Sequence, residues 1–212
     1  MLITTHLKSD IEKFALESNF KFAHYPLKNM LQRMESNFTL IVNYSNELSH
    51  IASENEDLVP GTVWILDNFY KVEEQVNHLR LSLSRKEKLQ LGILTDTVFK
   101  GYPRIYPLAI ELIKMTNGNF DENAIIDFLK TYQNVKILSI AEIWAFSTML
   151  TLAVIEKIAV VTKEIHTFQL GKLSAQAIDS ENPENTLKAV SEILENTADL
   201  SPVFIESLVR KL

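Results

Sequence analysis

The chain has 212 residues and a formal net charge of −6, with 46% of its residues hydrophobic and 23% charged, a composition typical of globular proteins. It contains no cysteine, which excludes disulfides, thiol catalysis and cysteine-ligated zinc sites. The acidic balance argues against a nucleic-acid interface, because its densest basic cluster, at 85–88, itself contains Glu87 and has no aromatic partners.

The spacing of apolar residues predicts a series of helices in the first half of the chain. Their expected ranges are 5–17, 27–51 and 62–79, followed by a short helix and a loop within 83–100. Pro26 fits the first turn of the second helix, where its missing N–H costs nothing. The turn at Val59-Pro60-Gly61 separates the second helix from the third.

Capping signals define the helices in the second half. Their expected ranges are 105–115, 122–132, 139–164, a short helix with a polar linker in 167–180, then 183–194 and a last helix from 202. Asn117-Gly118 is a typical helix end, Asp121 a typical N-cap, and Ser139 with Glu142 a capping box. No convincing strand is found. The sequence therefore predicts an all-α fold, an irregular multi-helix bundle of about eight or nine helices.

We expect one helical domain over 1–212. Within it, an N-terminal hairpin at 1–58 would pack on a core at 60–165, and C-terminal helices at 166–212 would continue into a downstream region. The pattern from Phe204 to Leu212 shows no helix stop, so we expect the chain to be cut within a helix.

Two segments bear on location. The N-terminal ten residues lack the basic and apolar regions of a signal peptide, and we expect a cytoplasmic protein. The apolar run at 143–155 has 13 residues and includes a serine and two threonines, whereas a membrane span needs about 20 apolar residues. We therefore expect a buried core helix and no membrane span.

The sequence contains no recognisable catalytic motif. The five histidines do not have the spacing of metal ligands, and the five glycines form no phosphate-binding loop, so we expect no metal and no cofactor. Asp67 and Glu74 share a helix face but lie about 10 Å apart along the axis, which is wide for a glycosidase pair. We expect Asp67 to be a buried, hydrogen-bonded acceptor.

Aromatic side chains offer a further alternative, a sugar-binding groove. The candidates are Trp64, Phe69, Tyr70, Tyr102, Tyr106 and Trp144. Such a groove requires an exposed tryptophan. Trp64 and Trp144 both lie in strongly apolar helical stretches, so we expect both to be buried in the core.

Three segments, at 64–75, 101–109 and 138–145, resemble successive motifs in the N-terminal region of cyclic β-1,2-glucan synthases. They read Trp-Ile-Leu-Asp-Asn-Phe-Tyr-Lys-Val-Glu-Glu-Gln, Gly-Tyr-Pro-Arg-Ile-Tyr-Pro-Leu-Ala and Leu-Ser-Ile-Ala-Glu-Ile-Trp-Ala. The residues that match the motifs are Trp64, Asp67, Asn68, Phe69, Glu73, Glu74, Gln75, Gly101, Tyr102, Pro103, Arg104, Tyr106, Glu142 and Trp144. A tyrosine-rich element of the family is absent from the interval 82–90.

The resemblance implies a bacterial, membrane-embedded parent enzyme that makes glucan from UDP-glucose. The family's Asp-x-Asp and Gln-x-x-Arg-Trp catalytic elements do not occur in the chain, so we expect a non-catalytic N-terminal helical region or fragment. Its partners would be the downstream synthase domains, in cis or as a split chain, at the cytoplasmic face of the inner membrane. The motif residues would be structural, with a buried ion pair between Arg104 and either Asp67 or Glu142.

Two alternatives to the synthase-fragment hypothesis remain open, a second and a third hypothesis. The chain could be a stand-alone helical interaction module without a carbohydrate role, docking a partner through an exposed apolar face on its first helix or near Leu212. A third and weaker hypothesis is direct binding of glucan by the aromatic residues.

Overall fold

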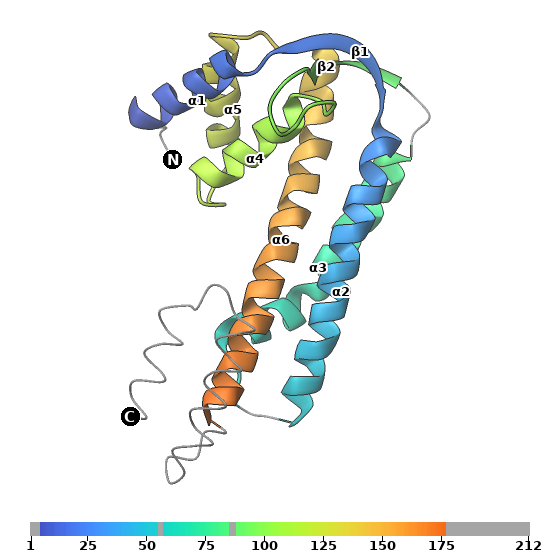
Figure 1. Ribbon diagram of the computed structural model, residues 1–212, viewed down its shortest axis with the longest axis vertical. Coiled ribbons are helices and arrows are strands. Elements are labelled where there is room, and N and C mark those ends of the chain that lie inside the picture. The colour runs from blue at the N-terminus through green and yellow to red at the C-terminus, as the bar shows by residue number, and fades with distance from the viewer. Residues whose placement is uncertain (1–4, 55–56, 85–87, 177–212) are drawn as a thin grey trace. The chain divides into compact units, whose positions relative to one another are not determined.

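The structure is a computed structural model that describes residues 5–54, 57–84 and 88–176 (Figure 1). Within these ranges the elements are α1 (Thr5–Glu17), β1 (Phe20–Pro26), the 3-10 helix η1 (Leu27–Met30), α2 (Leu31–Glu54), α3 (Pro60–Leu83), β2 (Lys88–Leu94), α4 (Ile105–Met115), α5 (Glu122–Gln133) and α6 (Ile140–Gln176). The prediction of a mainly helical protein is confirmed. The predicted count of eight or nine helices is not matched, and the prediction that no strand exists is wrong.

The described residues belong to two compact units. Unit 1 contains 1–36 and 74–157, and unit 2 contains 37–73 and 158–212. The helices α2, α3 and α6 each contribute residues to both units. The small sheet and the shorter helices α1, α4 and α5 all belong to unit 1.

The two strands form an antiparallel ladder in unit 1, with Phe20 opposite Leu94 and Pro26 opposite Lys88. The ladder corrects two predictions. Pro26 ends β1, with the following turn in η1, and the segment expected to form a short helix contains β2. The ladder pairs residues that are far apart in sequence, which local periodicity does not report.

The predicted capping signals are confirmed where the structure describes them. The Asp121 carboxylate accepts a hydrogen bond from Ala124 N at 2.8 Å at the start of α5. Gly118, with φ +73°, follows the end of α4, a backbone conformation that glycine adopts without strain. Ser139 N donates to Glu142 Oε2 at 2.8 Å, and Glu142 N donates to Ser139 Oγ at 3.2 Å. These are the two bonds of a capping box.

Helix α6 is longer than predicted. It runs through the expected end at Glu164 to Gln176 and includes the start of the segment expected to form a separate short helix. The helices predicted at 183–194 and from 202 lie outside the described residues.

The stretch Ile140–Leu173 is long and apolar enough to cross a membrane by length and composition alone. Its most apolar 18-residue window has a mean hydropathy of 1.6, and 39% of that window is buried. Core helices of soluble proteins have the same composition.

The core of unit 1 surrounds α4, whose residues Ile105 to Ala109 are all buried. Ile11 and Ala15 of α1 are fully buried, and α1 packs against α5. Phe128 and Tyr132 of α5, and Phe146 and Met149 of α6, complete the apolar interior. This interior surrounds the charged site described below.

Unit 2 is held together around a buried glutamine. Gln169 is fully buried, and its Oε1 accepts hydrogen bonds from Val59 N at 2.8 Å and from Thr62 Oγ1 at 3.2 Å. Its Nε2 donates to Asp57 O at 3.3 Å. One side chain of α6 thereby satisfies the backbone at the start of α3, where helical N–H groups have no partner within the helix.

Gln169→Leu is expected to lower the free energy of unfolding by about 1–3 kcal/mol, because it leaves the buried Val59 N–H without an acceptor. Urea denaturation followed by circular dichroism measures the change. The matched control is Gln32→Leu at an exposed position of α2, which should stay within about 0.5 kcal/mol of the wild type. Equal stability of the two variants would contradict the prediction.

Candidate functional site

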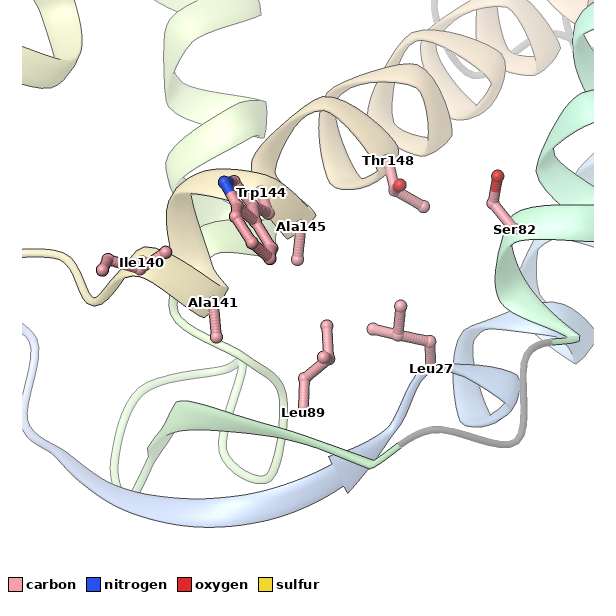
Figure 2. A pocket seen from close by; sticks show the side chains of 8 residues that line it. All are labelled: Leu27, Ser82, Leu89, Ile140, Ala141, Trp144, Ala145 and Thr148. Atoms are coloured by element: carbon pink, nitrogen blue, oxygen red, sulfur yellow. The ribbon is translucent and has the colours of Figure 1, made fainter.

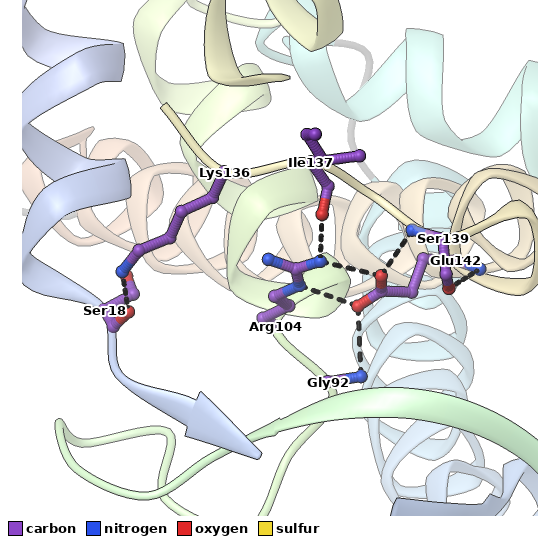
Figure 3. A network of polar contacts seen from close by, with 7 residues as sticks. All are labelled: Ser18, Gly92, Arg104, Lys136, Ile137, Ser139 and Glu142. Atoms are coloured by element: carbon purple, nitrogen blue, oxygen red, sulfur yellow. Dashed lines mark hydrogen bonds and ion pairs between the residues drawn. The ribbon is translucent and has the colours of Figure 1, made fainter. Parts of the chain in front are cut away.

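The most distinctive polar feature of unit 1 is a buried ion pair between two of the sequence motifs. Arg104 precedes the first turn of α4 and Glu142 lies in the first turn of α6, with side chains 1% and 0% exposed. Arg104 Nε donates to Glu142 Oε1 at 2.7 Å and Nη2 donates to Oε2 at 2.8 Å (Figure 3). This is the two-pronged geometry in which a guanidinium binds a carboxylate most strongly.

Backbone groups add further hydrogen bonds to the pair, and Arg104 Nη1 is left buried without a hydrogen-bond partner among the described residues. Glu142 Oε1 also accepts from Gly92 N at 3.0 Å, and Arg104 Nη2 donates to Ile137 O at 2.6 Å. Glu142 Oε2 accepts the capping-box bond from Ser139 N. The carboxylate therefore links strand β2, the turn before α4 and the start of α6, which are three segments distant in sequence.

The two charges keep each other ionised. Burial raises the pKa of Glu142, but hydrogen bonds from Arg104, Ser139 N and Gly92 N outweigh burial and hold the pKa below its usual value. Burial lowers the pKa of Arg104, and its hydrogen bonds to Glu142 more than restore it, so the net shift is upward. The pair is a fixed salt bridge over the neutral pH range.

Aromatic rings and one glycine enclose the guanidinium. The Arg104 Cζ atom lies 3.8 Å from the centre of the Phe20 ring and 6.0 Å from that of Tyr132, distances typical of cation–π contacts. Because Gly92 of β2 has no side chain, there is room beside it for both ions. A Cβ atom there would lie 2.7 Å from Phe20, 2.9 Å from Arg104 Nε and 2.9 Å from Glu142 Oε1.

A second polar cluster in unit 1 also uses the motif at 101–109. Tyr106 is fully buried, and its hydroxyl donates to Glu156 Oε2 at 2.5 Å. Arg33 Nε donates to Glu156 Oε1 at 2.5 Å, and its guanidinium lies over the rings of Tyr102 and Tyr106. Burial and the contact with Glu156 raise the pKa of Tyr106 well above its usual value, so the phenol remains protonated.

The prediction that both tryptophans are buried is wrong. Trp64 is 57% exposed and Trp144 is 78% exposed. The buried Glu142 explains Trp144: two residues turn an α-helix by about 200°, so the side of α6 that carries Trp144 points away from the core. Ala145 and Met149, three and seven residues after Glu142, are buried on its own side.

Trp144 lines a pocket of about 440 Å³ in unit 1 (Figure 2). The lining residues are Leu27, Ser82, Leu89, Ile140, Ala141, Trp144, Ala145 and Thr148. They come from η1, the end of α3, β2 and the first turns of α6. Among the lining residues that the structure describes, none is charged, and Ser82 and Thr148 carry side-chain hydroxyls.

The motif on α3 is not part of either cluster. Asp67, Glu73, Glu74 and Gln75 are all exposed, which corrects the prediction that Asp67 is a buried acceptor. Of the two partners predicted for Arg104, Glu142 is confirmed and Asp67 is wrong. Phe69 is half-buried and stacks on Phe38 in unit 2, with ring centres 6.3 Å apart.

Of the remaining matched residues, Gly101 and Pro103 lie in the turn before α4. Gly101 has φ +88°, and its N–H donates to Leu94 O at 2.9 Å. Pro103 forms an isolated bridge with Ile93. Asn68 lies on α3, where its side chain donates to Trp64 O at 2.8 Å.

Sequence reasoning did not identify Gly92, Phe20 or Tyr132 as parts of the charged site. A glycine within the apolar segment 88–94 was the available signal for Gly92, since glycine in a strand often marks a close approach. No local signal connects Phe20 or Tyr132 to Arg104, because their contacts depend on the tertiary fold.

The chemistry of the site favours a structural role. Both carboxylate oxygens of Glu142 are engaged, and neither ion is accessible to a substrate. Among the residues that the structure describes, no group of three or more histidine, aspartate or glutamate side chains could hold a metal ion.

No protein-family model matches the chain. Among curated proteins, it is similar to the cyclic beta-(1,2)-glucan synthase NdvB of Rhizobium meliloti (strain 1021), with 29% identity over 103 residues. The match covers 48% of this chain and 4% of the synthase. It indicates a distant relationship between part of this chain and a small region of a glucan synthase.

Gly92→Ala is expected to lower the free energy of unfolding by at least about 1–3 kcal/mol, because the added methyl group overlaps both ions and Phe20. Chemical denaturation gives the value. The control is Gly61→Ala, a helical position whose Cβ would have its three nearest neighbours in the Ile165 side chain, from 3.0 Å, and no ion among them; it should remain within about 1 kcal/mol of the wild type. An unchanged stability of Gly92→Ala would contradict the described packing.

Glu142→Gln is expected to destabilise the protein by about 3 kcal/mol at neutral pH, since it leaves Arg104 buried without a counter-charge. The pKa of Glu142 is lower in the folded state than its usual 4.5, so its contribution is present above that pH and lost as the pH falls below it. The stability difference between wild type and variant should therefore shrink in acid.

Urea denaturation across the acidic range measures this difference. The exposed Glu12→Gln is the matched control and should follow the wild type at each pH. A difference between Glu142→Gln and wild type that stays constant with pH would contradict the assignment.

Proposed function

We propose that this chain is a non-catalytic, mainly helical region of a protein resembling cyclic β-1,2-glucan synthase, in which the motif residues maintain the fold. The observation that carries the proposal is the Arg104–Glu142 ion pair. It joins the second and third motifs of the resemblance in one buried contact with two hydrogen bonds between the side chains. Residues in such a position hold segments together and are closed to substrate.

The similarity to a glucan synthase supports the same proposal from a separate direction. Because the chain spans 4% of that synthase, the transferase chemistry of a parent protein would reside elsewhere. The partners we propose are synthase domains, linked in cis or supplied as a separate chain. The proposed location is the cytoplasmic face of the inner membrane, without a membrane span in this chain.

A second candidate function is a stand-alone interaction module without a carbohydrate role. The observation that favours it is the exposure of large apolar side chains around the start of α6: Ile137, three residues before the helix, is 79% exposed, and Ile140, its first residue, is 70% exposed. On α1, Leu16 is also 67% exposed. The other surface expected from the sequence, near Leu212, lies outside the described residues.

The purified chain is expected to transfer no glucose from labelled UDP-glucose, alone or with added β-1,2-glucan primer, because the Asp-x-Asp and Gln-x-x-Arg-Trp elements do not occur in it. Thin-layer chromatography of the products is the measurement. A membrane fraction containing an active cyclic glucan synthase is the positive control. Labelled glucan formed by the purified chain would reject the non-catalytic proposal.

The reading frame beyond the codon for Leu212 separates the two candidates. Transferase motifs in the continuing frame, or in an adjacent frame, would support the synthase proposal. An isolated gene, together with a purified chain that fails to co-purify with co-expressed synthase domains, would favour the interaction module.

A further inference from the structure

One side of α3 carries an alternating row of exposed aromatic and acidic side chains. The row consists of Trp64, Asp67, Tyr70 and Glu73, all of which belong to unit 2. Both aromatic side chains are more than half exposed, and both acidic residues are exposed. Residues three apart on a helix are neighbours, with Cβ atoms about 5–6 Å apart. Each carboxylate of this row, which we call the α3 ridge, therefore lies beside an aromatic ring.

The packing of α3 uses the opposite side of the helix. Ile65, two residues before Asp67, and Val76, nine residues after it, are both buried. Two residues turn an α-helix by about 200° and nine residues by about 180° net, so both buried side chains lie across the helix from Asp67. Burial therefore does not account for Trp64 and Asp67, two of the residues that match the first sequence motif.

In unit 1, the same combination of an aromatic ring and a carboxylate holds an arginine. Arg104 Cζ lies 3.8 Å from the centre of the Phe20 ring, while the guanidinium binds Glu142 through two hydrogen bonds. A guanidinium can make both contacts at once, because its planar face stacks on a ring while its edge donates paired hydrogen bonds to a carboxylate.

Arg33 repeats this arrangement at a less buried position. Its side chain is 41% exposed and its Nε donates to Glu156 Oε1 at 2.5 Å. Its Cζ atom lies 5.2 Å from the centre of the Tyr106 ring. The arrangement thus also forms at a partly exposed position. The α3 ridge presents its two acceptor halves, the ring and the carboxylate, to solvent.

A cation already lies over one ring of the ridge. Lys71 Nζ is 5.7 Å from the centre of the Tyr70 ring and donates to Asn68 Oδ1 at 3.0 Å. This contact shows that the exposed Tyr70 ring is accessible to a cation. Asp67 and Glu73 outnumber the single ammonium group, so the charges of this part of α3 favour a cationic partner.

We propose that the α3 ridge is a docking surface for an arginine-bearing segment of a partner protein, whose guanidinium groups stack on Trp64 and Tyr70 and pair with Asp67 and Glu73. Tryptophan, tyrosine and arginine supply most of the binding energy at protein interfaces. Asp67 and Glu73 lie about 9 Å apart along the helix axis. Two arginines three residues apart in an extended segment match this distance, at about 3.3 Å per residue. The inference goes beyond the proposed function and does not rest on it.

The chain contains two tryptophans, which makes a direct test available. Trp144→Phe leaves Trp64 as the single indole, at the ridge. This variant is titrated with the peptide Gly-Arg-Leu-Ala-Arg-Gly, acetylated and amidated at its ends, while tryptophan emission is recorded. The matched control peptide carries citrulline, a neutral analogue of arginine with the same shape, at both arginine positions. A second control peptide carries lysine.

A saturable change in emission is expected with the arginine peptide in Trp144→Phe and none in Trp64→Phe, where Trp144 is the reporter. The citrulline peptide should not bind, because it cannot pair with the carboxylates. The lysine peptide should bind more weakly than the arginine peptide, because an ammonium group lacks the planar face that stacks on a ring.

Substitutions in the Trp144→Phe background locate the contact. Asp67→Asn should weaken binding of the arginine peptide by about 2- to 5-fold, the effect of one exposed ion pair. The matched Asp10→Asn, at an exposed position of α1, should leave it unchanged. Tyr70→Leu should weaken binding, and Tyr70→Phe, which keeps the ring, should not. Circular dichroism and urea denaturation establish that each variant is folded, as expected for exposed positions.

Three outcomes of the titrations would overturn the proposal. They are an absence of any saturable change at Trp64 in the folded Trp144→Phe variant, equal binding of the citrulline peptide, and equal effects of Asp67→Asn and Asp10→Asn.

Two further measurements test other occupants of the ridge. Shielding of Trp64 from acrylamide in the free Trp144→Phe variant would assign the ridge to a contact within the chain. A dimer in sedimentation velocity that Tyr70→Leu dissociates would assign it to a second copy. Either result would overturn the proposal, which requires an accessible Trp64 on a chain whose association state Tyr70→Leu does not change.

Discussion

The structure of unit 1 depends on burying one arginine and one glutamate in the same apolar interior. Removing both charges from water is costly, and the cost is offset only if their hydrogen-bonding groups are met by well-placed partners. Gly92, Ser139 and Ile137 provide backbone partners, while Arg104 Nη1 is buried without a hydrogen bond to any described residue. The pair thereby fixes the position of Gly92 in β2, the start of α4 and the rotation of α6 about its own axis. Unit 2 uses a neutral equivalent, in which the amide of Gln169 holds the start of α3.

Much of the fold could be predicted because its signals are local. The Asp121 cap, the glycine after α4 and the Ser139–Glu142 capping box each depend on residues within about one helical turn, and each is present in the structure. The strands could not be found in the same way. Phe20 pairs with Leu94 across the sequence, and neither seven-residue segment has a regular alternation of buried and exposed positions.

Part of the candidate site could also be predicted, because a local sequence rule applies to it. A charged residue in an apolar helix requires a partner, which identified Glu142 and Arg104 as a pair without specifying the geometry. The exposure of Trp144 could not be predicted, because the start of α6 is apolar around its whole circumference and its periodicity does not indicate a buried side. Only the position of Glu142 in the tertiary structure resolves which face is inward. The apolar stretch that suggested a core tryptophan instead places Trp144 at the surface beside a pocket.

The separation of the two ions along the chain has a consequence for how the protein forms. Gly92 and Arg104 meet through a short local loop, since Arg104 N donates to Gly92 O, and such contacts form early because little chain entropy is lost. Glu142 follows 38 residues after Arg104 and is synthesised after all of α4 and α5. The buried ion pair therefore cannot form before the first turn of α6 has been synthesised.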